Sequence, residues 1–129
     1  MTISAIPNQL GELFIAATSV DNRNVIGWFE KNQIKFLRRS QYREVVQNIS
    51  LSLQKIGFSH QEKAAILGAT SKEWHFCDVG ILCCGGVVIP IYPSYLSEEI
   101  LYIMKHSDCS VLFIENEKQL SKILSIQNN

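Results

Sequence analysis

The sequence predicts an α/β fold: a parallel, doubly wound βαβ layer of three strands with flanking helices, preceded by an N-terminal helix and a β-hairpin. Three short apolar runs, at residues 64–69, 87–91 and 110–114, alternate with segments of helical periodicity. Continuous apolar strands are typical of a parallel sheet that is buried on both faces. Their alternation with helices indicates right-handed βαβ units, and the 129 residues suffice for one compact domain.

The first part of the chain predicts a helix, a hairpin and a second, longer helix. Strands at 24–29 and 34–37 flank Lys31-Asn32-Gln33, which predicts a turn because Asn tolerates positive φ. Residues 41–56 have a clear helical apolar period, and Ser40 precedes them as the expected N-cap. The first helix is expected to have the following cap and apolar stripe: Asn8, Leu10, Leu13, Phe14 and Ala17.

The segment between the first two apolar runs predicts a buried helix over residues 72–84. Thr70-Ser71 offers an N-cap, and Glu73 lies where the positive end of the helix dipole favours it. The last two turns are apolar on all sides, which indicates burial. The pair Gly85-Gly86 is then expected to end the helix and to return the chain tightly into the next strand.

The run Val87–Ile91 is expected to form a central parallel strand. Pro90 lacks a ladder donor and therefore predicts a strand end or a local break. Ser97 is the expected N-cap of the next helix, which begins with two glutamates where the dipole favours them. A short helix from Glu117 to Leu124 is expected after the last strand.

Composition and charge argue against several classes of protein. Twelve basic and twelve acidic side chains give a formal net charge of zero, which does not suggest electrostatic binding to nucleic acid. No apolar run approaches the length of a transmembrane segment, and residues 1–10 do not resemble a signal peptide. Four cysteines without such a signal favour free thiols in a reducing compartment, so a cytoplasmic location is expected.

Four residues of metal-ligand type lie close together in the sequence, namely His75, Cys77, Cys83 and Cys84. Their spacing is not that of structural zinc, since residues two apart diverge by about 200° around a helix and adjacent residues also point apart. The cysteines are interpreted as small, buried apolar residues. The pair Gly85-Gly86 follows a helix and precedes a strand, which is the opposite order from a phosphate-binding loop.

Other catalytic patterns are also missing from the sequence. A receiver domain would need carboxylates at the strand ends, where this chain has Ala69-Thr70, Tyr92-Pro93 and Glu115. There is no Gly-x-Ser-x-Gly nucleophile elbow. Asp78 is expected to be partly buried with a structural hydrogen bond, and Trp74 is expected to anchor the core. We therefore predict no catalytic, cofactor-binding or metal-binding residue in this chain.

The order of eight segments is informative as a combination. These segments are Tyr42-Arg43-Glu44-Val45, Leu53-x-x-x-Gly57, Ala64–Leu67, Ser71-Lys72-Glu73-Trp74, Cys83–Pro93, Glu98–Ile103, His106-Ser107-Asp108 and Val111–Ile114. Together they resemble the start of the AMP-forming adenylating enzymes, over about residues 25–124. The pair Glu73-Trp74 and the later segment Lys118–Ile123 are most similar to the long-chain fatty acid–CoA ligase (acyl-CoA synthetase) branch.

Two positions depart from the pattern of that family. Members usually carry Gly-Asp where this chain has Gln61-Glu62, and often Asn where it has Thr70. The first lies in an expected surface loop and the second at an expected helix cap, so both leave the predicted fold unchanged.

The resemblance implies that the chain is an N-terminal fragment of such a ligase and part of a larger N-terminal domain. The family joins a carboxylate to ATP to form an acyl-adenylate and pyrophosphate, and the thiol of CoA then displaces AMP. The family's phosphate loop, ribose-binding Asp, hinge and catalytic Lys have no match in residues 1–129. The fragment alone is therefore expected to be inactive, and fatty acid, ATP, Mg²⁺ and CoA are implied for the full enzyme only.

Two alternatives stay open from the sequence. The chain could be a free-standing α/β binding or interaction domain, or a fragment of a different adenylate-forming ligase that acts on short-chain or aryl acids. A fragment of a larger sheet should leave strand edges or a helix-packing face uncovered, which predicts self-association. For the full enzyme we expect a cytoplasmic location, which is compatible with association with a membrane surface.

Overall fold

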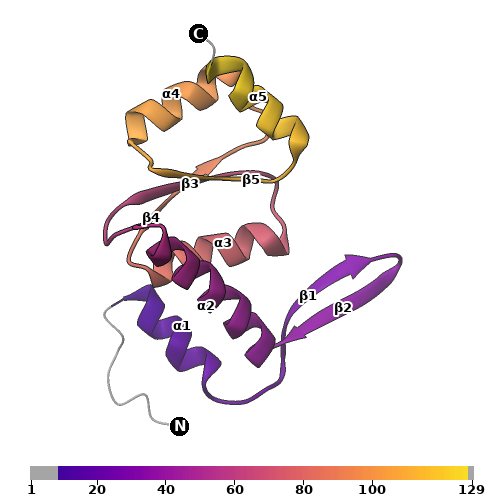
Figure 1. Ribbon diagram of the computed structural model, residues 1–129. Coiled ribbons are helices and arrows are strands. Elements are labelled where there is room, and N and C mark those ends of the chain that lie inside the picture. The colour runs from indigo at the N-terminus through magenta and orange to yellow at the C-terminus, as the bar shows by residue number, and fades with distance from the viewer. Residues whose placement is uncertain (1–8, 128–129) are drawn as a thin grey trace.

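The computed structural model describes residues 9–127 and contains five helices and five strands within them (Figure 1). The elements in chain order are α1 (Leu10–Thr18), β1 (Asn24–Glu30), β2 (Gln33–Arg38), α2 (Arg39–Lys55), β3 (Lys63–Leu67), α3 (Lys72–Cys83), β4 (Val87–Ile91), α4 (Ser97–Ser107), β5 (Val111–Ile114) and α5 (Glu117–Gln127). The predicted α/β fold is confirmed, and the three continuous apolar runs form the three strands of one parallel sheet.

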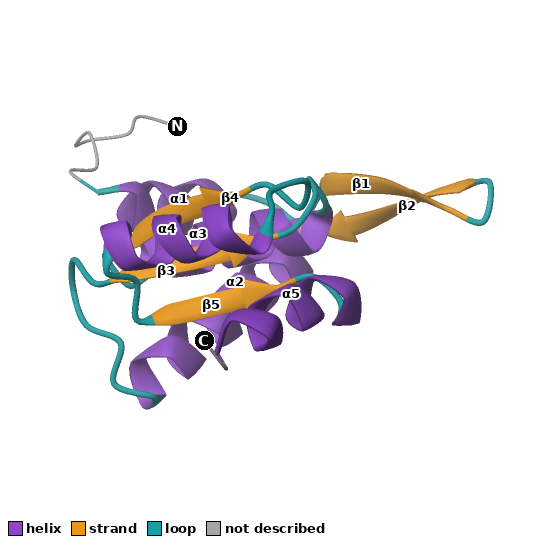
Figure 2. Ribbon diagram, turned by 90° about the horizontal axis from the view of Figure 1, so that it is seen from above, coloured by secondary structure: helices purple, strands orange, loops and turns teal. Residues whose placement is uncertain are grey.

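The parallel sheet has the strand order β4-β3-β5. Helices α1, α2 and α3 lie on one face of the sheet, and α4 and α5 lie on the other (Figure 1). The antiparallel pair β1–β2 forms a separate two-stranded sheet that projects away from this body (Figures 1 and 2). The layered arrangement follows from strands that are apolar on both faces and need a helix layer on each.

The central strand β3 shows why its sequence is continuously apolar. Ala64 and Ile66 pack into the core on the side of α2 and α3, and Ala65 and Leu67 pack into the core on the side of α4 and α5. All four side chains are buried. Because successive side chains of a strand point to opposite faces, both faces of β3 require apolar residues.

The expected central position of Val87–Ile91 is wrong, because β4 is an edge strand of the described sheet. Pro90 lies within the strand, opposite Ile66 of β3. The amide of Val87 donates to Glu62 and the carbonyl of Ile91 accepts from Gly68, so alternate residues of β4 bond to the β3 side. Pro90 lies between these residues, so its backbone faces away from β3. Its missing N–H therefore lies at the free edge, where no ladder bond is lost.

One of the three serines expected to cap a helix does so. The hydroxyl of Ser71 accepts from the amide of Trp74 at 3.0 Å, as predicted for α3. Ser40 and Ser97 lie inside the first turns of α2 and α4, so their expected roles are wrong. At these two helices a side chain inside the first turn bonds back to the backbone that precedes the helix. The side chains of Gln41 and Glu99 accept from the amides three residues earlier, at 2.9 and 2.7 Å. That arrangement is the second half of a capping box and needs no serine.

The turn after α3 has the predicted form. Gly85 adopts a positive φ of 71°. A Cβ on Gly86 would lie 2.6 Å from the ring of Phe58 and 2.9 Å from Ile81. The pair therefore ends the helix and lets β4 pass close to the core, as the sequence predicted.

The first helix differs from the prediction. Asn8, its expected cap, lies outside the described residues. Phe14 is buried, but Leu10 and Leu13 are 60% and 44% exposed. The helix contacts α3, and Phe14 packs edge-on against Tyr42 with the ring centroids 5.3 Å apart.

In residues 9–127, none of the helices has both the length and the apolar character that crossing a membrane requires.

Candidate functional site: a cleft at the switch point of the sheet

The carboxyl ends of β3 and β5 form the topological switch point of the sheet. Helix α3 leaves β3 toward the face that α1 and α2 cover, whereas α5 follows β5 on the opposite face (Figure 1). Because the two connections diverge, a crevice opens outside the ends of two neighbouring strands. Open α/β sheets bind ligands at such positions.

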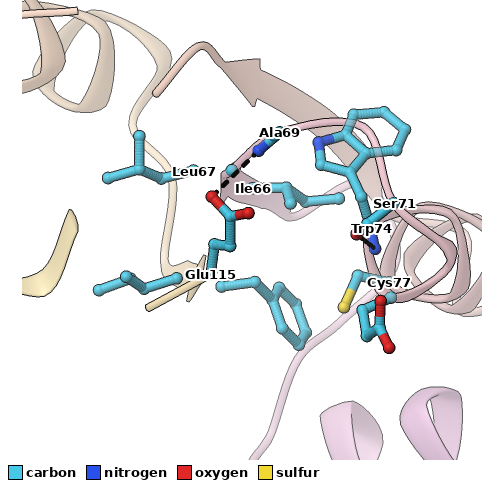
Figure 3. A pocket seen from close by; sticks show the side chains of 11 residues that line it. Ile66, Leu67, Ala69, Ser71, Trp74, Cys77 and Glu115 are labelled. Carbon is cyan, nitrogen blue, oxygen red and sulfur yellow. Dashed lines mark hydrogen bonds between the residues drawn. The ribbon is translucent and has the colours of Figure 1, made fainter. Parts of the chain in front are cut away.

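A cleft of about 350 Å³ lies at this position (Figure 3). We call it the switch-point cleft. Its floor is made by the last residues of β3 and β5, including Ile66 and Phe113. Trp74 and Cys77 of α3 line one side, and Glu115 lines the other (Figure 3). The volume lies at the lower end of the range typical of small-molecule sites.

Glu115 is fixed at the rim of the cleft by backbone contacts. Its carboxylate accepts a hydrogen bond of 3.2 Å from the amide of Ala69, and its own amide donates to Leu67 at 3.0 Å. These two bonds tie the end of β5 to the loop that follows β3. The Glu115 side chain is therefore held at the rim beside the Ala69 amide.

The other polar groups of the cleft are poor nucleophiles or bases. Burial raises the pKa of the Cys77 thiol, with a smaller effect from the charge of Glu73, so the thiol stays protonated at neutral pH. The Ser71 hydroxyl is engaged as the cap of α3. A hydrogen bond from Lys72 holds the pKa of Glu73 below its ordinary value. The cleft can thus contact an apolar group, but it does not assemble a catalytic pair.

The four residues of metal-ligand type point to different places. His75 bonds to Tyr42 through Nε2 at 2.7 Å, and Cys84 lies 3.1 Å from the Ser50 hydroxyl. Cys77 and Cys83 pack against different core clusters. Among residues 9–127, no group of three or more His, Cys, Asp or Glu side chains could hold a metal ion.

Two further predictions concern half-buried side chains of α3. Trp74 packs against the core cluster of Ile66 and Ile81, as expected of an anchor, and it also lines the switch-point cleft. Asp78 is partly buried, as expected, and burial raises the pKa of its carboxyl. The structural hydrogen bond expected for it is not found among the described residues.

No local sequence pattern predicts the switch-point cleft. At the strand ends only Glu115 is acidic, which is too few carboxylates for a receiver domain, and no sequence pattern links it to Ala69-Thr70. The signal that finds the cleft is topological, because it requires the strand order and the side of the sheet on which each helix lies.

Comparison with known proteins identifies the family of the chain. Residues 16–129 match the profile of the AMP-binding enzymes. The long-chain-fatty-acid–CoA ligase ACSBG2 of Rattus norvegicus is 33% identical over 126 residues, which are 98% of this chain and 18% of that protein. The chain thus spans about one fifth of the length of the curated relatives it matches.

Solved structures share the fold at low sequence identity. The N-terminal domain of FACL13 from Mycobacterium tuberculosis superposes with a TM-score of 0.83 at 17% identity, covering 95% of this chain and 31% of that one. The anthranilate CoA ligase AuaEII, solved with anthranoyl-AMP, gives a TM-score of 0.80 at 21% identity, covering 99% of this chain and 24% of that one. The strand order, the layering and the match over residues 16–129 lead to one conclusion: the chain belongs to the AMP-binding enzyme family.

Proposed function

We propose that residues 1–129 form one partial domain, the opening layer of the N-terminal domain of an ATP-dependent long-chain fatty acid–CoA ligase. In the full enzyme the fatty acid carboxylate attacks the α-phosphorus of ATP, which gives an acyl-adenylate and releases pyrophosphate. The thiol of CoA then attacks the acyl carbon, which gives acyl-CoA and releases AMP. The observation that carries the proposal is the match of residues 16–129 to the AMP-binding enzymes.

The choice of a fatty acid over other carboxylates depends on sequence rather than on fold. The curated relatives at 30–33% identity are named long-chain-fatty-acid–CoA ligases. The fold does not distinguish substrates, since an anthranilate CoA ligase and a fatty acid AMP ligase both superpose on this chain. A short-chain or aryl acid ligase is therefore the alternative that a substrate assay must test.

The switch-point cleft does not fit the triphosphate of ATP, and no group of three or more metal-ligating side chains lies among residues 9–127 to hold Mg²⁺. The switch-point cleft is lined by two carboxylates, Glu73 and Glu115, and by no Lys, Arg or His. A triphosphate needs cationic side chains or outward-pointing amides at a helix N-terminus. At the start of α3, Ser71 already accepts from the Trp74 amide. We therefore place the groups that bind ATP, Mg²⁺ and CoA in the remainder of the longer protein and derive no step through them here.

The proposal is tested by assaying the chain and the longer protein side by side. Both are incubated with ATP, Mg²⁺ and palmitate, and adenylate formation is followed by pyrophosphate release and by trapping the acyl-adenylate with hydroxylamine. We expect the longer protein to form the adenylate and, with CoA, the thioester. We expect residues 1–129 to form neither. Adenylate formation by residues 1–129 alone would show that the placement of the catalytic groups is wrong.

Two observations separate the alternatives. An open reading frame past Asn129 that encodes a Ser/Thr/Gly-rich phosphate loop supports the ligase, and a stop codon there supports a free-standing binding domain. Competition among palmitate, butyrate and benzoate separates a long-chain ligase from a short-chain or aryl acid ligase. For the full enzyme we propose a cytoplasmic location with membrane association, which cell fractionation tests.

A further inference from the structure

The β1–β2 hairpin has two different faces. Cross-strand partners point to the same side of a two-stranded sheet, and the register pairs Phe29 with Ile34 and Gly27 with Phe36. The ring of Phe36 lies directly over Gly27, since a Cβ there would be 3.0 Å from the ring. These residues make one face, which we call the outer hairpin face. The intervening pair Trp28–Lys35 belongs to the opposite face.

The opposite face holds the hairpin on the body of the protein. Ile26 and Leu37 pack against the core cluster that contains Tyr42. The Nζ of Lys72 lies 4.9 Å from the centroid of the Trp28 ring, and the indole N–H of Trp28 donates to Glu30 at 3.1 Å. This face therefore has partners within the chain, and its contacts fix which side of the hairpin points away.

The outer hairpin face has large apolar side chains without cover. Phe29 is 75% exposed, Ile34 is 56% exposed and Phe36 is 53% exposed. They are contiguous across the two strands, and contiguous exposed apolar side chains mark an interaction surface. An isolated two-stranded hairpin is also marginally stable in water and needs packing against another layer.

We propose that the outer hairpin face docks through Phe29, Ile34 and Phe36 against an apolar layer of the polypeptide that completes the longer ligase. Relatives continue well beyond the matched region, because the chain spans only 18% of the length of the first of them. The four residues of the face carry no charge, which disfavours anionic lipid headgroups as the occupant. This inference depends on the proposed function, since it takes the chain as part of a longer protein.

Hydrogen exchange tests the docking without any measurement of ligase activity. Amide exchange is measured for residues 24–38 in residues 1–129 at low concentration and in the longer protein. We expect exchange at least tenfold slower in the longer protein. The double variant Phe29→Asp, Phe36→Asp should remove that protection in the longer protein. Gln33→Asp, which is exposed on the opposite face, is the matched control and should keep it.

Four outcomes overturn the docking. The first is equal exchange of the hairpin in the two proteins, whether or not the longer protein has ligase activity. The second is protection that survives the double Asp variant. The third is protection in the longer protein that grows with its concentration, which would assign the face to a second copy. The last is protection that appears only with added phosphatidylcholine vesicles, which would assign it to a lipid surface.

Discussion

Tyr42 of α2 and His75 of α3 are joined by a hydrogen bond of 2.7 Å between Oη and Nε2. Their rings are nearly parallel, with centroids 5.6 Å apart, and Phe14 packs edge-on against Tyr42. One tyrosine thus connects three helices on one face of the sheet. The pair lies in the helix layer formed by α1, α2 and α3, and neither residue lines the switch-point cleft.

Replacing Tyr42 with Phe should lower the free energy of unfolding at neutral pH by about 1 kcal/mol, because a partly buried hydrogen bond is lost. Burial, with smaller effects from Cys83 and Asp78, raises the pKa of Tyr42 from 10.0 to about 12. A pKa that is raised on folding contributes stability below pH 10, and this stability is lost as the pH rises toward 12. Urea unfolding should therefore show a shallower alkaline decline in Tyr42→Phe. An unchanged alkaline decline in the variant would contradict this role.

Replacing Ser71 with Ala should destabilise the protein by about 1 kcal/mol, since the hydroxyl caps α3. Ser40→Ala is the matched control, because the Ser40 side chain does not cap α2 and its backbone amide keeps its bond to Asn22. Chemical denaturation of the two variants checks the difference. Equal effects of the two substitutions would show that the capping assignment is wrong.

Gly80→Ala should destabilise the packing of α2 against α3 by about 1–3 kcal/mol, the usual cost of overpacking. A Cβ at Gly80 would lie 2.5 Å from Cγ2 of Ile49. The added methyl group therefore has to displace the Ile49 side chain or move the two helices apart. The double variant Gly80→Ala, Ile49→Ala should cost less than the sum of the single changes, because the second substitution removes Cγ2, the atom nearest to the added methyl group. Additive effects in a thermal unfolding cycle would contradict the proposed contact.

Gln61→Gly should stabilise the protein by about 0.5–1 kcal/mol. Gln61 has a φ of 66°, and the left-handed region costs a residue with a Cβ roughly 1–2 kcal/mol, partly offset by the greater freedom of Gly in the unfolded chain. This is one of the positions where the chain departs from the family pattern of Gly-Asp. Gln61→Ala retains the Cβ and should give no gain. A Gly variant no more stable than the Ala variant in urea would rule out relief of backbone strain.

Residues 1–129 alone should self-associate. Strands β4 and β5 are the edges of the described sheet, and exposed edges and apolar faces favour pairing between copies. Light scattering coupled to size exclusion should give a mass of at least a dimer at tens of micromolar, roughly the range where such surfaces pair. The Phe29→Asp, Phe36→Asp variant should reduce the mass. A monomer at that concentration would contradict the prediction.

The sequence predicted the classes of elements well, because local patterns determine them. Continuous apolar runs made β3, β4 and β5 recognisable, and the Ser71 cap followed from a serine placed before a helical period. The stripe expected on α1 failed because helical spacing does not say how much of the face is covered. Phe14 packs against Tyr42, whereas Leu10 and Leu13 are exposed to solvent.

The sequence by itself determined the α/β class, the order of the elements and the resemblance to adenylating enzymes, since these depend on residue type and spacing along the chain. Tertiary structure decided the remaining features, because they depend on neighbours that are distant in sequence. It placed Pro90 at a free edge, where its missing N–H costs no ladder bond. It also brought Trp74 and Glu115 to the two sides of one cleft, because α3 and α5 leave adjacent strands toward opposite faces of the sheet.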